Sequence, residues 1–135
     1  KFRKMNIEEL KKSAEGIAET MDELKARQNA IVNLEAEVSD EILRIQGEIS
    51  DLEKMAVALP AFESLKLGVI QDALDQHIKI TGKIFDLNER KYALYMNLEK
   101  LYLEYDAIMD KLEAHTSRLD KITEQLDSFD HPKNN

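Results

Sequence analysis

The 135-residue sequence is acidic, with a formal net charge of −8, and it contains no Cys, no Trp, four Gly and two Pro. Without Cys there is no disulfide framework, thiolate metal site or cysteine nucleophile, and the redox compartment stays open. Residues 1–12 carry five basic and two acidic side chains, residues 13–59 carry four and eleven, and residues 60–129 carry nine and thirteen. This acidic body argues against nucleic-acid binding, which needs a basic face to neutralise phosphates.

The composition, with 34% charged and 43% apolar residues, is typical of long amphipathic helices. No apolar run approaches the roughly 20 residues that a bilayer-spanning helix needs. The sequence begins with Lys1 rather than Met, so we expect a processed chain or an excerpt of a longer protein. Its basic opening suits either a segment just inside a membrane helix or a simple basic first turn, and the second is favoured.

The first predicted element is a helix over about residues 5–58, because apolar residues recur there with the 3.5-residue average spacing of a coiled coil. Its a positions are Ile7, Ala14, Met21, Gln28, Glu35, Ile42, Ile49 and Ala56. Its d positions are Leu10, Ile17, Leu24, Ile31, Val38, Ile45, Leu52 and Leu59. Every d residue is a branched aliphatic, and only two polar residues interrupt the a column.

The heptad pattern then fails, which predicts a break over about residues 57–64. Glu63 and Lys66 occupy the a and d positions there. Pro60 lacks a backbone donor and biases the preceding residue away from helix, but it suits the first position of a new helix. Ser64 is a competing cap for a later start.

A second helix is predicted over about residues 62–129, followed by a frayed tail at 130–135. Its a positions are Ile70, His77, Ile84, Lys91, Leu98, Tyr105, Leu112, Leu119 and Leu126. Its d positions are Ala73, Ile80, Leu87, Leu94, Leu101, Ile108, His115, Ile122 and Phe129. Three polar residues interrupt this seam.

These elements predict an all-α fold: one coiled-coil domain over residues 1–135, built as a long antiparallel helical hairpin that assembles into a four-helix bundle. The alternative is a kinked parallel coiled-coil dimer, which the heptad frame shared by both helices would suit. A third possibility is a three-helix fold bent near Gly82 or Asn88.

Part of the second helix is apolar over more than a narrow seam, since 13 of the 18 residues in 92–109 are apolar. A stripe wider than a seam implies that more than one helix packs against it. The candidate partner-binding residues are Leu74, Ile78, Phe85, Tyr92, Tyr95, Tyr102 and Met109. The core of a homodimer is the favoured explanation, ahead of a docking face for a different helical protein. A membrane-facing surface is disfavoured by the intervening Glu99, Glu104, Asp106 and Asp110.

Polar residues in the seam are the candidate determinants of register and partner choice, at a cost in stability. They are Gln28, Glu35, His77, Lys91 and His115. If the chain folds back near residue 63, Glu35 and Lys91 lie at the same level and form an ion pair. The two histidines are candidate pH-sensitive layers, although tolerated neutral histidines are the favoured explanation.

No pattern for catalysis, metal binding or cofactor binding is evident. Neither seam histidine follows a Glu by three residues, as di-iron helical bundles require. The four glycines are isolated, so no phosphate-binding loop exists. We therefore expect no enzyme activity, no metal, no cofactor and no small-molecule substrate.

The predicted function is that of a non-enzymatic coiled-coil structural or adaptor protein that mediates protein–protein assembly, with a second copy or another helical protein as its partner. One alternative is the soluble coiled-coil region of a membrane-anchored protein, acting as a tether. Another is a membrane-surface-binding helical module. Membrane contact is expected only through segments outside this chain, and a cytoplasmic location is favoured.

Overall fold

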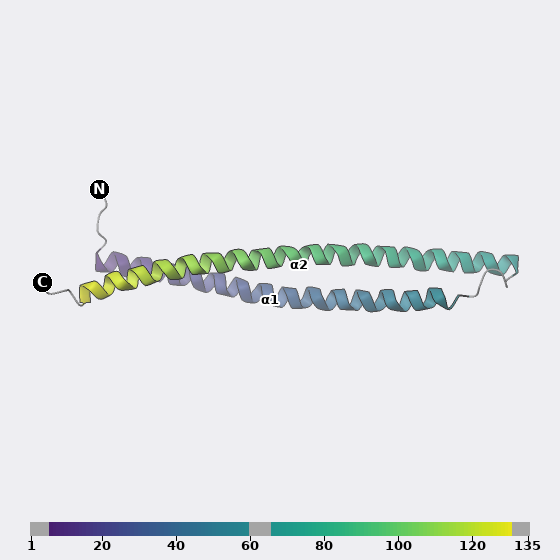
Figure 1. Cartoon of the computed structure of the whole chain (residues 1–135), viewed down its shortest axis with the longest axis horizontal. Helices are drawn as coiled ribbons and strands as arrows, with labels where there is room; N and C mark the ends of the chain where they lie inside the picture. The colour runs from purple at the N-terminus through teal and green to yellow at the C-terminus, as the bar shows by residue number, and fades with distance from the viewer. Residues whose placement is uncertain (1–5, 60–65, 131–135) are drawn as a thin grey trace, which may run out of the picture. The chain divides into compact units, whose positions relative to one another are not determined.

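The computed structural model of the chain describes residues 6–59 and 66–130, and it places two α-helices in them. Helix α1 spans Ile7–Val57 and helix α2 spans Leu67–Asp130, and the described residues contain no strand. The two helices run antiparallel (Figure 1). The predicted all-α helical hairpin is therefore confirmed, and the kinked parallel arrangement is not the one observed.

Helix α1 begins where its sequence supplies a cap. The backbone N–H of Glu9 donates to Oδ1 of Asn6 at 2.8 Å, which satisfies one of the free donors of the first turn. Glu8 and Glu9 lie in that turn, where carboxylates interact favourably with the helix dipole. At the other end Lys54 lies in the last turn, and the helix stops at Val57, three residues before Pro60.

Helix α2 begins at Leu67, where the carbonyl of Lys66 accepts hydrogen bonds from the backbone N–H groups of Val69 and Ile70. The predicted start near residue 62, with Pro60 or Ser64 at its head, lies outside the described residues. The helix continues without interruption past Gly82 and Asn88, so the three-helix alternative does not apply.

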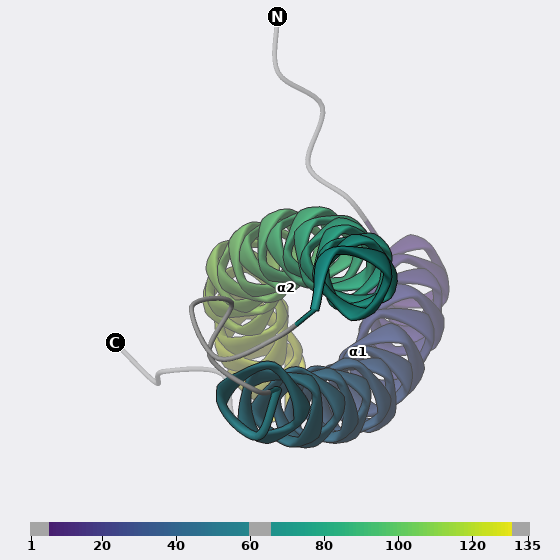
Figure 2. The same cartoon turned by 90° about the vertical axis from the view of Figure 1, so that its right-hand side faces the viewer.

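The chain divides into two compact units, and both helices contribute to each. The terminal unit comprises Lys1–Asn33 and Tyr102–Asn135, and the central unit comprises Leu34–Leu101. Within each unit the helices lie side by side in both views (Figures 1 and 2).

The core of each unit is the predicted heptad seam. Every buried apolar residue among those described occupies an a or d position: Leu10, Ile17, Ile31 and Ile108 in the terminal unit, and Ile42, Ile45, Ile49, Ala73, Ile80 and Leu101 in the central unit. Burying a large aliphatic side chain contributes about 1.5–3 kcal/mol to folding. The seam therefore buries or half-buries the a and d side chains of both helices except Ile7, His77 and Phe129, so a further interaction would use mainly the other five heptad positions.

Candidate functional site

The central unit has two lateral edges, one on each side of the seam. In an antiparallel pair, the e positions of the two helices flank one side and the g positions flank the other. The structure shows both pairings: Nε2 of Gln46 donates to the hydroxyl of Tyr95 at 3.3 Å between e positions, and Arg90 pairs with Glu41 between g positions. We call the b and e positions of both helices the e edge, and the c and g positions the g edge.

The e edge of the central unit is almost uncharged. On α1 it consists of Ala36, Ser39, Leu43, Gln46, Ser50, Glu53 and Val57. On α2 it consists of Leu67, Gln71, Leu74, Ile78, Thr81, Phe85, Asn88, Tyr92, Tyr95 and Glu99. Only Glu53 and Glu99 carry a charge, so a partner could cover most of this edge without desolvating an ion.

Large apolar side chains project from this edge into solvent. Ile78, Phe85 and Tyr92, which recur at seven-residue intervals, are 64%, 61% and 68% exposed. Leu74 and Tyr95 are a little under half exposed beside them, and Leu43 adds a 65% exposed side chain from α1. Isolated exposed apolar residues are ordinary, but a contiguous set of them indicates an interaction surface.

A hollow on this edge has the geometry of a coiled-coil hole. It is lined by Phe85, Asn88, Glu89 and Tyr92, which are spaced i, i+3, i+4 and i+7 along α2. Four residues at this spacing form the hole into which one side chain of a facing helix inserts. The two rings form the walls of this hole, and it is open on the exposed surface of the central unit.

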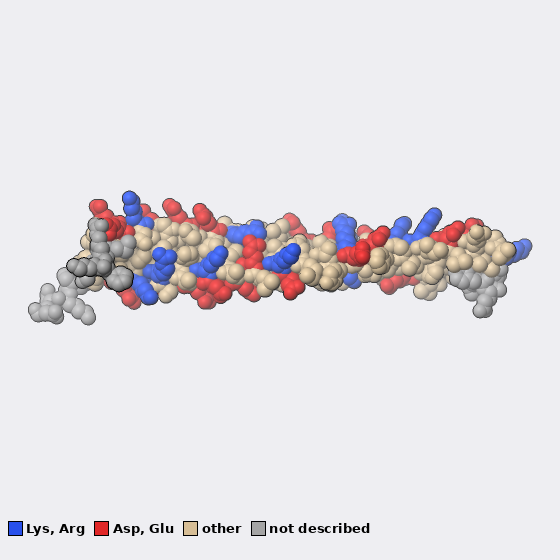
Figure 3. Space-filling view, turned by 90° about the horizontal axis from the view of Figure 1, so that it is seen from above, with Lys and Arg blue, Asp and Glu red and all other residues tan. Residues whose placement is uncertain are grey.

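The g edge of the same unit is highly charged. Its charged members are Glu37, Glu41, Arg44, Glu48, Asp51, Asp72, Lys79, Lys83, Asp86, Arg90 and Lys100. The carboxylate of Glu41 accepts from both Arg90 and Arg44, the latter at 2.7 Å. On the visible face in Figure 3, basic and acidic side chains are interspersed and the basic ones form no continuous patch.

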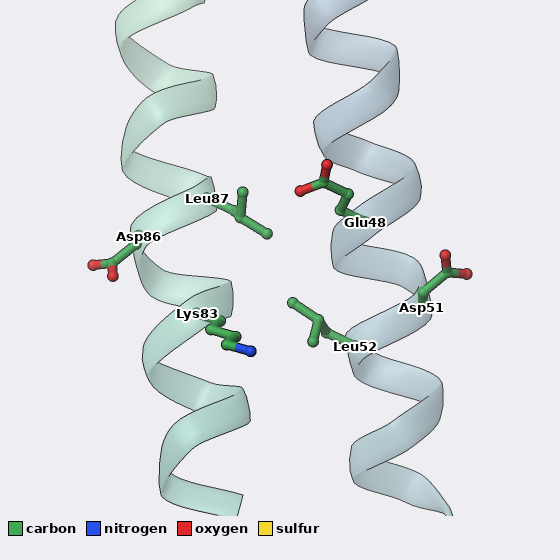
Figure 4. Close-up of a pocket in the computed structure, with 6 residues that line it drawn as sticks. All are labelled: Glu48, Asp51, Leu52, Lys83, Asp86 and Leu87. Carbon is green, nitrogen blue, oxygen red and sulfur yellow. The ribbon is translucent and has the colours of Figure 1, made fainter.

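An open groove crosses the g edge of the central unit. Leu52 of α1 and Leu87 of α2 point toward one another between the helices, while Asp51 and Asp86 point away (Figure 4). Glu48 and Lys83 also line the groove, and all four charged residues are exposed. Catalytic and ligand-binding groups are usually desolvated and surrounded by convergent polar partners, and this groove offers neither condition.

The e edge of the terminal unit carries many charged side chains, unlike the e edge of the central unit. The charged residues there are Glu8, Lys11, Glu15, Asp22 and Lys25 on α1 and Asp106, Glu113, Asp120 and Asp127 on α2. Tyr102, Met109 and Val32 are exposed among them, at 51%, 41% and 49%. The seven predicted partner-binding residues are thus all exposed, but only five of them lie on the uncharged edge of the central unit.

The g edge of the terminal unit holds a two-point ion pair. Nε and Nη2 of Arg27 donate to the two carboxylate oxygens of Glu104 at 2.7 and 2.9 Å. These hydrogen bonds, with a smaller contribution from the opposite charge, lower the pKa of Glu104 below its ordinary value. Both side chains remain more than 40% exposed, so the pair is a surface interaction.

The polar seam residues have different environments. Gln28, Glu35, Lys91 and His115 are half-buried, whereas His77 is exposed. In the terminal unit, Nε2 of Gln28 and Nδ1 of His115 are buried without a hydrogen-bond partner among the described residues. A role for these five residues in register or partner choice stays a prediction.

The expected ion pair between Glu35 and Lys91 is not formed among the described residues of the central unit. Arg90, the neighbour of Lys91, pairs instead with Glu41. Glu41 lies six residues beyond Glu35, which is about 9 Å of helix rise. The prediction was wrong because it assumed a register symmetric about residue 63, and the observed helices pair in a different register.

The α1 half of the e edge was missed by the sequence analysis, which considered only α2. The signal is present in the sequence, because residues 36–57 carry a single charge at their b and e positions. It becomes meaningful only when the antiparallel pairing places the e positions of α1 beside those of α2.

Within residues 6–59 and 66–130, no group of three His, Cys, Asp or Glu side chains is arranged to hold a metal ion. Neither α1 nor α2 contains a stretch long and apolar enough to cross a membrane. Comparisons of the chain with protein-family models, curated proteins and solved structures found no match.

Proposed function

We propose that this chain is a non-enzymatic coiled-coil adaptor that assembles protein chains through the e edge of its central unit. The observation that carries the proposal is the row of exposed Ile78, Phe85 and Tyr92 on an edge where only Glu53 and Glu99 are charged. The opposite edge of the same unit carries eleven charged side chains interspersed with exposed Leu34, Met55 and Val69, so it has no comparable uncharged row among the described residues.

The chemistry of the row suits a protein partner. Tyr and Phe are enriched in the desolvated centres of protein interfaces, where charged residues are depleted. The hydroxyl of Tyr95 already accepts a hydrogen bond from Gln46, so its polar end has a partner within the chain and its ring can be covered at little cost. Covering apolar surface contributes about 25 cal/mol per Å².

The expected partner is helical. The hole formed by Phe85, Asn88, Glu89 and Tyr92 accepts a single side chain of a facing helix. Apolar residues at the b positions Ile78, Phe85 and Tyr92 recur along α2 every seven residues, so a partner helix would find an equivalent contact on every second turn. A helix that lies on this edge would use the helix-in-groove mode of recognition.

Site-specific photo-crosslinking inside the producing cells tests this proposal. A photoreactive phenylalanine analogue is placed at Tyr92, on the e edge, or at Ala93, the next residue and a c position on the g edge. We expect discrete protein adducts, to this chain or to another, from position 92 and few from position 93.

Equal adducts from both positions, or none from position 92, would contradict the proposal. A chain that crosslinks to lipid at position 92, and that co-floats with vesicles of anionic phospholipid, would replace it with membrane-surface binding.

A further inference from the structure

We infer that the partner on the e edge of the central unit is a second copy of this chain, so that two central units form a four-helix bundle. This inference rests on the proposed function and specifies its partner. Three properties of the molecule support it: the distribution of charge, the area of the edge and the period of the exposed residues.

Charge restricts the surfaces through which two copies can meet. Each chain carries a formal net charge of −8, so most pairs of identical faces bring carboxylates together. On the e edge of the terminal unit, for example, Asp106, Glu113 and Asp120 would meet their own equivalents. The e edge of the central unit avoids this repulsion, because Glu53 and Glu99 are its only charges.

The area of the edge is sufficient for a stable dimer. Residues 36–57 of α1 and 74–95 of α2 each span 21 residue steps, which is about 32 Å of helix. Two adjacent helices, each about 10 Å wide, give a face of roughly 640 Å². Covering this face on both copies would bury roughly 1,300 Å², within the range of specific protein interfaces.

A second copy also presents exposed apolar residues with the seven-residue repeat that packing against this edge requires. Ile78, Phe85 and Tyr92 occupy consecutive b positions, with Leu74 and Tyr95 at e positions that flank the row. Knobs-into-holes packing over several turns requires the same seven-residue repeat on both partners. Two copies in a symmetric, self-complementary contact meet this requirement over the whole edge.

The test is the mass of the purified 135-residue chain in solution, measured by sedimentation equilibrium over a range of concentrations. We expect the wild-type chain to approach twice its monomer mass of 15.6 kDa. Tyr92→Glu places a carboxylate in the exposed row of this face and should weaken the dimer by about 30-fold or more. Ala93→Glu adds the same charge one residue away, on the g edge, and should leave the dissociation constant within a few-fold of wild type.

Neither substitution touches the seam, so both variants should retain the helical circular dichroism of wild type, and Phe85→Glu provides an independent disruption of the same face. A wild-type chain that stays monomeric at every concentration would overturn the inference, as would equal effects of Tyr92→Glu and Ala93→Glu. If the purified chain is monomeric while position 92 still crosslinks to a different protein in cells, only the identity of the partner is wrong. If no adduct forms either, the proposed function fails as well.

Discussion

In the terminal unit the b and e positions of both helices carry mainly carboxylates and lysines, whereas in the central unit the same positions carry apolar, aromatic and uncharged polar residues with two exceptions, Glu53 and Glu99. Both units bury the same a and d seam. The seam therefore explains why the chain forms a hairpin, and it does not distinguish the two units. Their difference lies in largely exposed residues outside the seam, and contiguous exposed apolar residues of this kind are typical of interaction surfaces.

The two units also differ at a surface hollow on α2. In each unit the residues that line this hollow include a set spaced i, i+3, i+4 and i+7 along the helix, as in a coiled-coil hole. In the terminal unit it is lined by Met109, Leu112, Glu113, Thr116, Ser117 and Asp120, so two carboxylates surround it. In the central unit two aromatic rings form its walls and Glu89 is its one charged residue. A partner side chain entering the first hollow would desolvate charge, whereas one entering the second would cover mainly apolar surface.

The largest expected effect is on the free energy of unfolding, and it distinguishes the buried seam of the central unit from its exposed e edge. Ile45 is 1% exposed and Leu43 is 65% exposed, two residues away on the same helix. Ile45→Ala should lower the free energy of unfolding by about 2–5 kcal/mol, and Leu43→Ala should change it by less than about 0.5 kcal/mol. Urea denaturation followed by circular dichroism measures both, at a concentration where the chain is monomeric. Comparable losses would mean that Leu43 belongs to the folding core and not to a free edge.

The second effect concerns the seam of the terminal unit, where Nε2 of Gln28 is buried without a partner. Gln28→Leu removes this unpaired donor and should raise the free energy of unfolding by about 1–2 kcal/mol. Gln46→Leu is the matched control in the central unit, since Gln46 is exposed and makes a hydrogen bond to Tyr95; it should change stability by less than about 0.5 kcal/mol. A loss of stability on Gln28→Leu would show that the amide is satisfied in solution.

Gln28→Leu also tests the predicted role of polar seam residues in specificity. Replacing a polar a residue by Leu often permits other registers and oligomers. If the mass of the variant differs from that of wild type in sedimentation, Gln28 restricts assembly. If only the stability changes, the residue is a tolerated defect in the seam.

Features that neighbouring turns of one helix determine could be predicted from the sequence, whereas features that depend on how the two helices pair could not. Every buried described residue was in the predicted frame, because heptad periodicity is a local property that each turn of helix repeats. The register was not predicted correctly, because Glu35 and Lys91 are both a positions, and in an antiparallel pair the a positions of one helix lie opposite the d positions of the other. The observed pair of Arg90 and Glu41 joins two g positions beside the seam, and its level depends on how the two helices pack along their length.

Only the α2 half of the candidate surface was predicted, for a related reason. The row from Leu74 to Tyr95 was evident because its residues share one helix. The contribution of Leu43 and Gln46 required the pairing direction, which places α1 and α2 e positions on the same side. Exposure was a further unknown, because an apolar residue at an e position can equally be covered by a third helix of its own chain.

A smaller effect is expected from the glycines at f positions of the central unit. A Cβ built on Gly47 or Gly82 meets no atom within 4 Å, and neither has a positive φ. Gly47→Ala and Gly82→Ala should each raise the free energy of unfolding by about 0.5–1 kcal/mol, because Ala has less conformational entropy to lose. Gly16→Ala, at a c position where a Cβ also meets no atom within 4 Å, is the comparison in the terminal unit. A gain from Gly16→Ala alone would mean that another chain approaches the central glycines too closely for a methyl group.

The smallest effect concerns the ion pair of Arg27 and Glu104, and its pH dependence has a definite sign. Hydrogen bonding to Arg27 lowers the pKa of Glu104 in the folded chain, so the unfolded chain binds more protons between the two pKa values. The contribution of the pair to stability is therefore complete above the ordinary Glu pKa of about 4.3 and disappears as the pH falls through the lowered value. A double-mutant cycle with Arg27→Met and Glu104→Gln should give a small favourable coupling at pH 7 that disappears as the pH falls through the lowered pKa of Glu104 and weakens in high salt.

The pair of Arg90 and Glu41 in the central unit is the control for that cycle. Glu41 also accepts from Arg44, so removing Arg90 leaves its carboxylate with a cationic partner. Coupling in the cycle of Arg90→Met and Glu41→Gln should therefore be weaker than in the terminal unit, where Arg27 alone donates both hydrogen bonds to Glu104. A stronger coupling in the central unit would mean that its g edge is less hydrated than its exposure suggests, and that a partner covers the charged edge instead of the uncharged one.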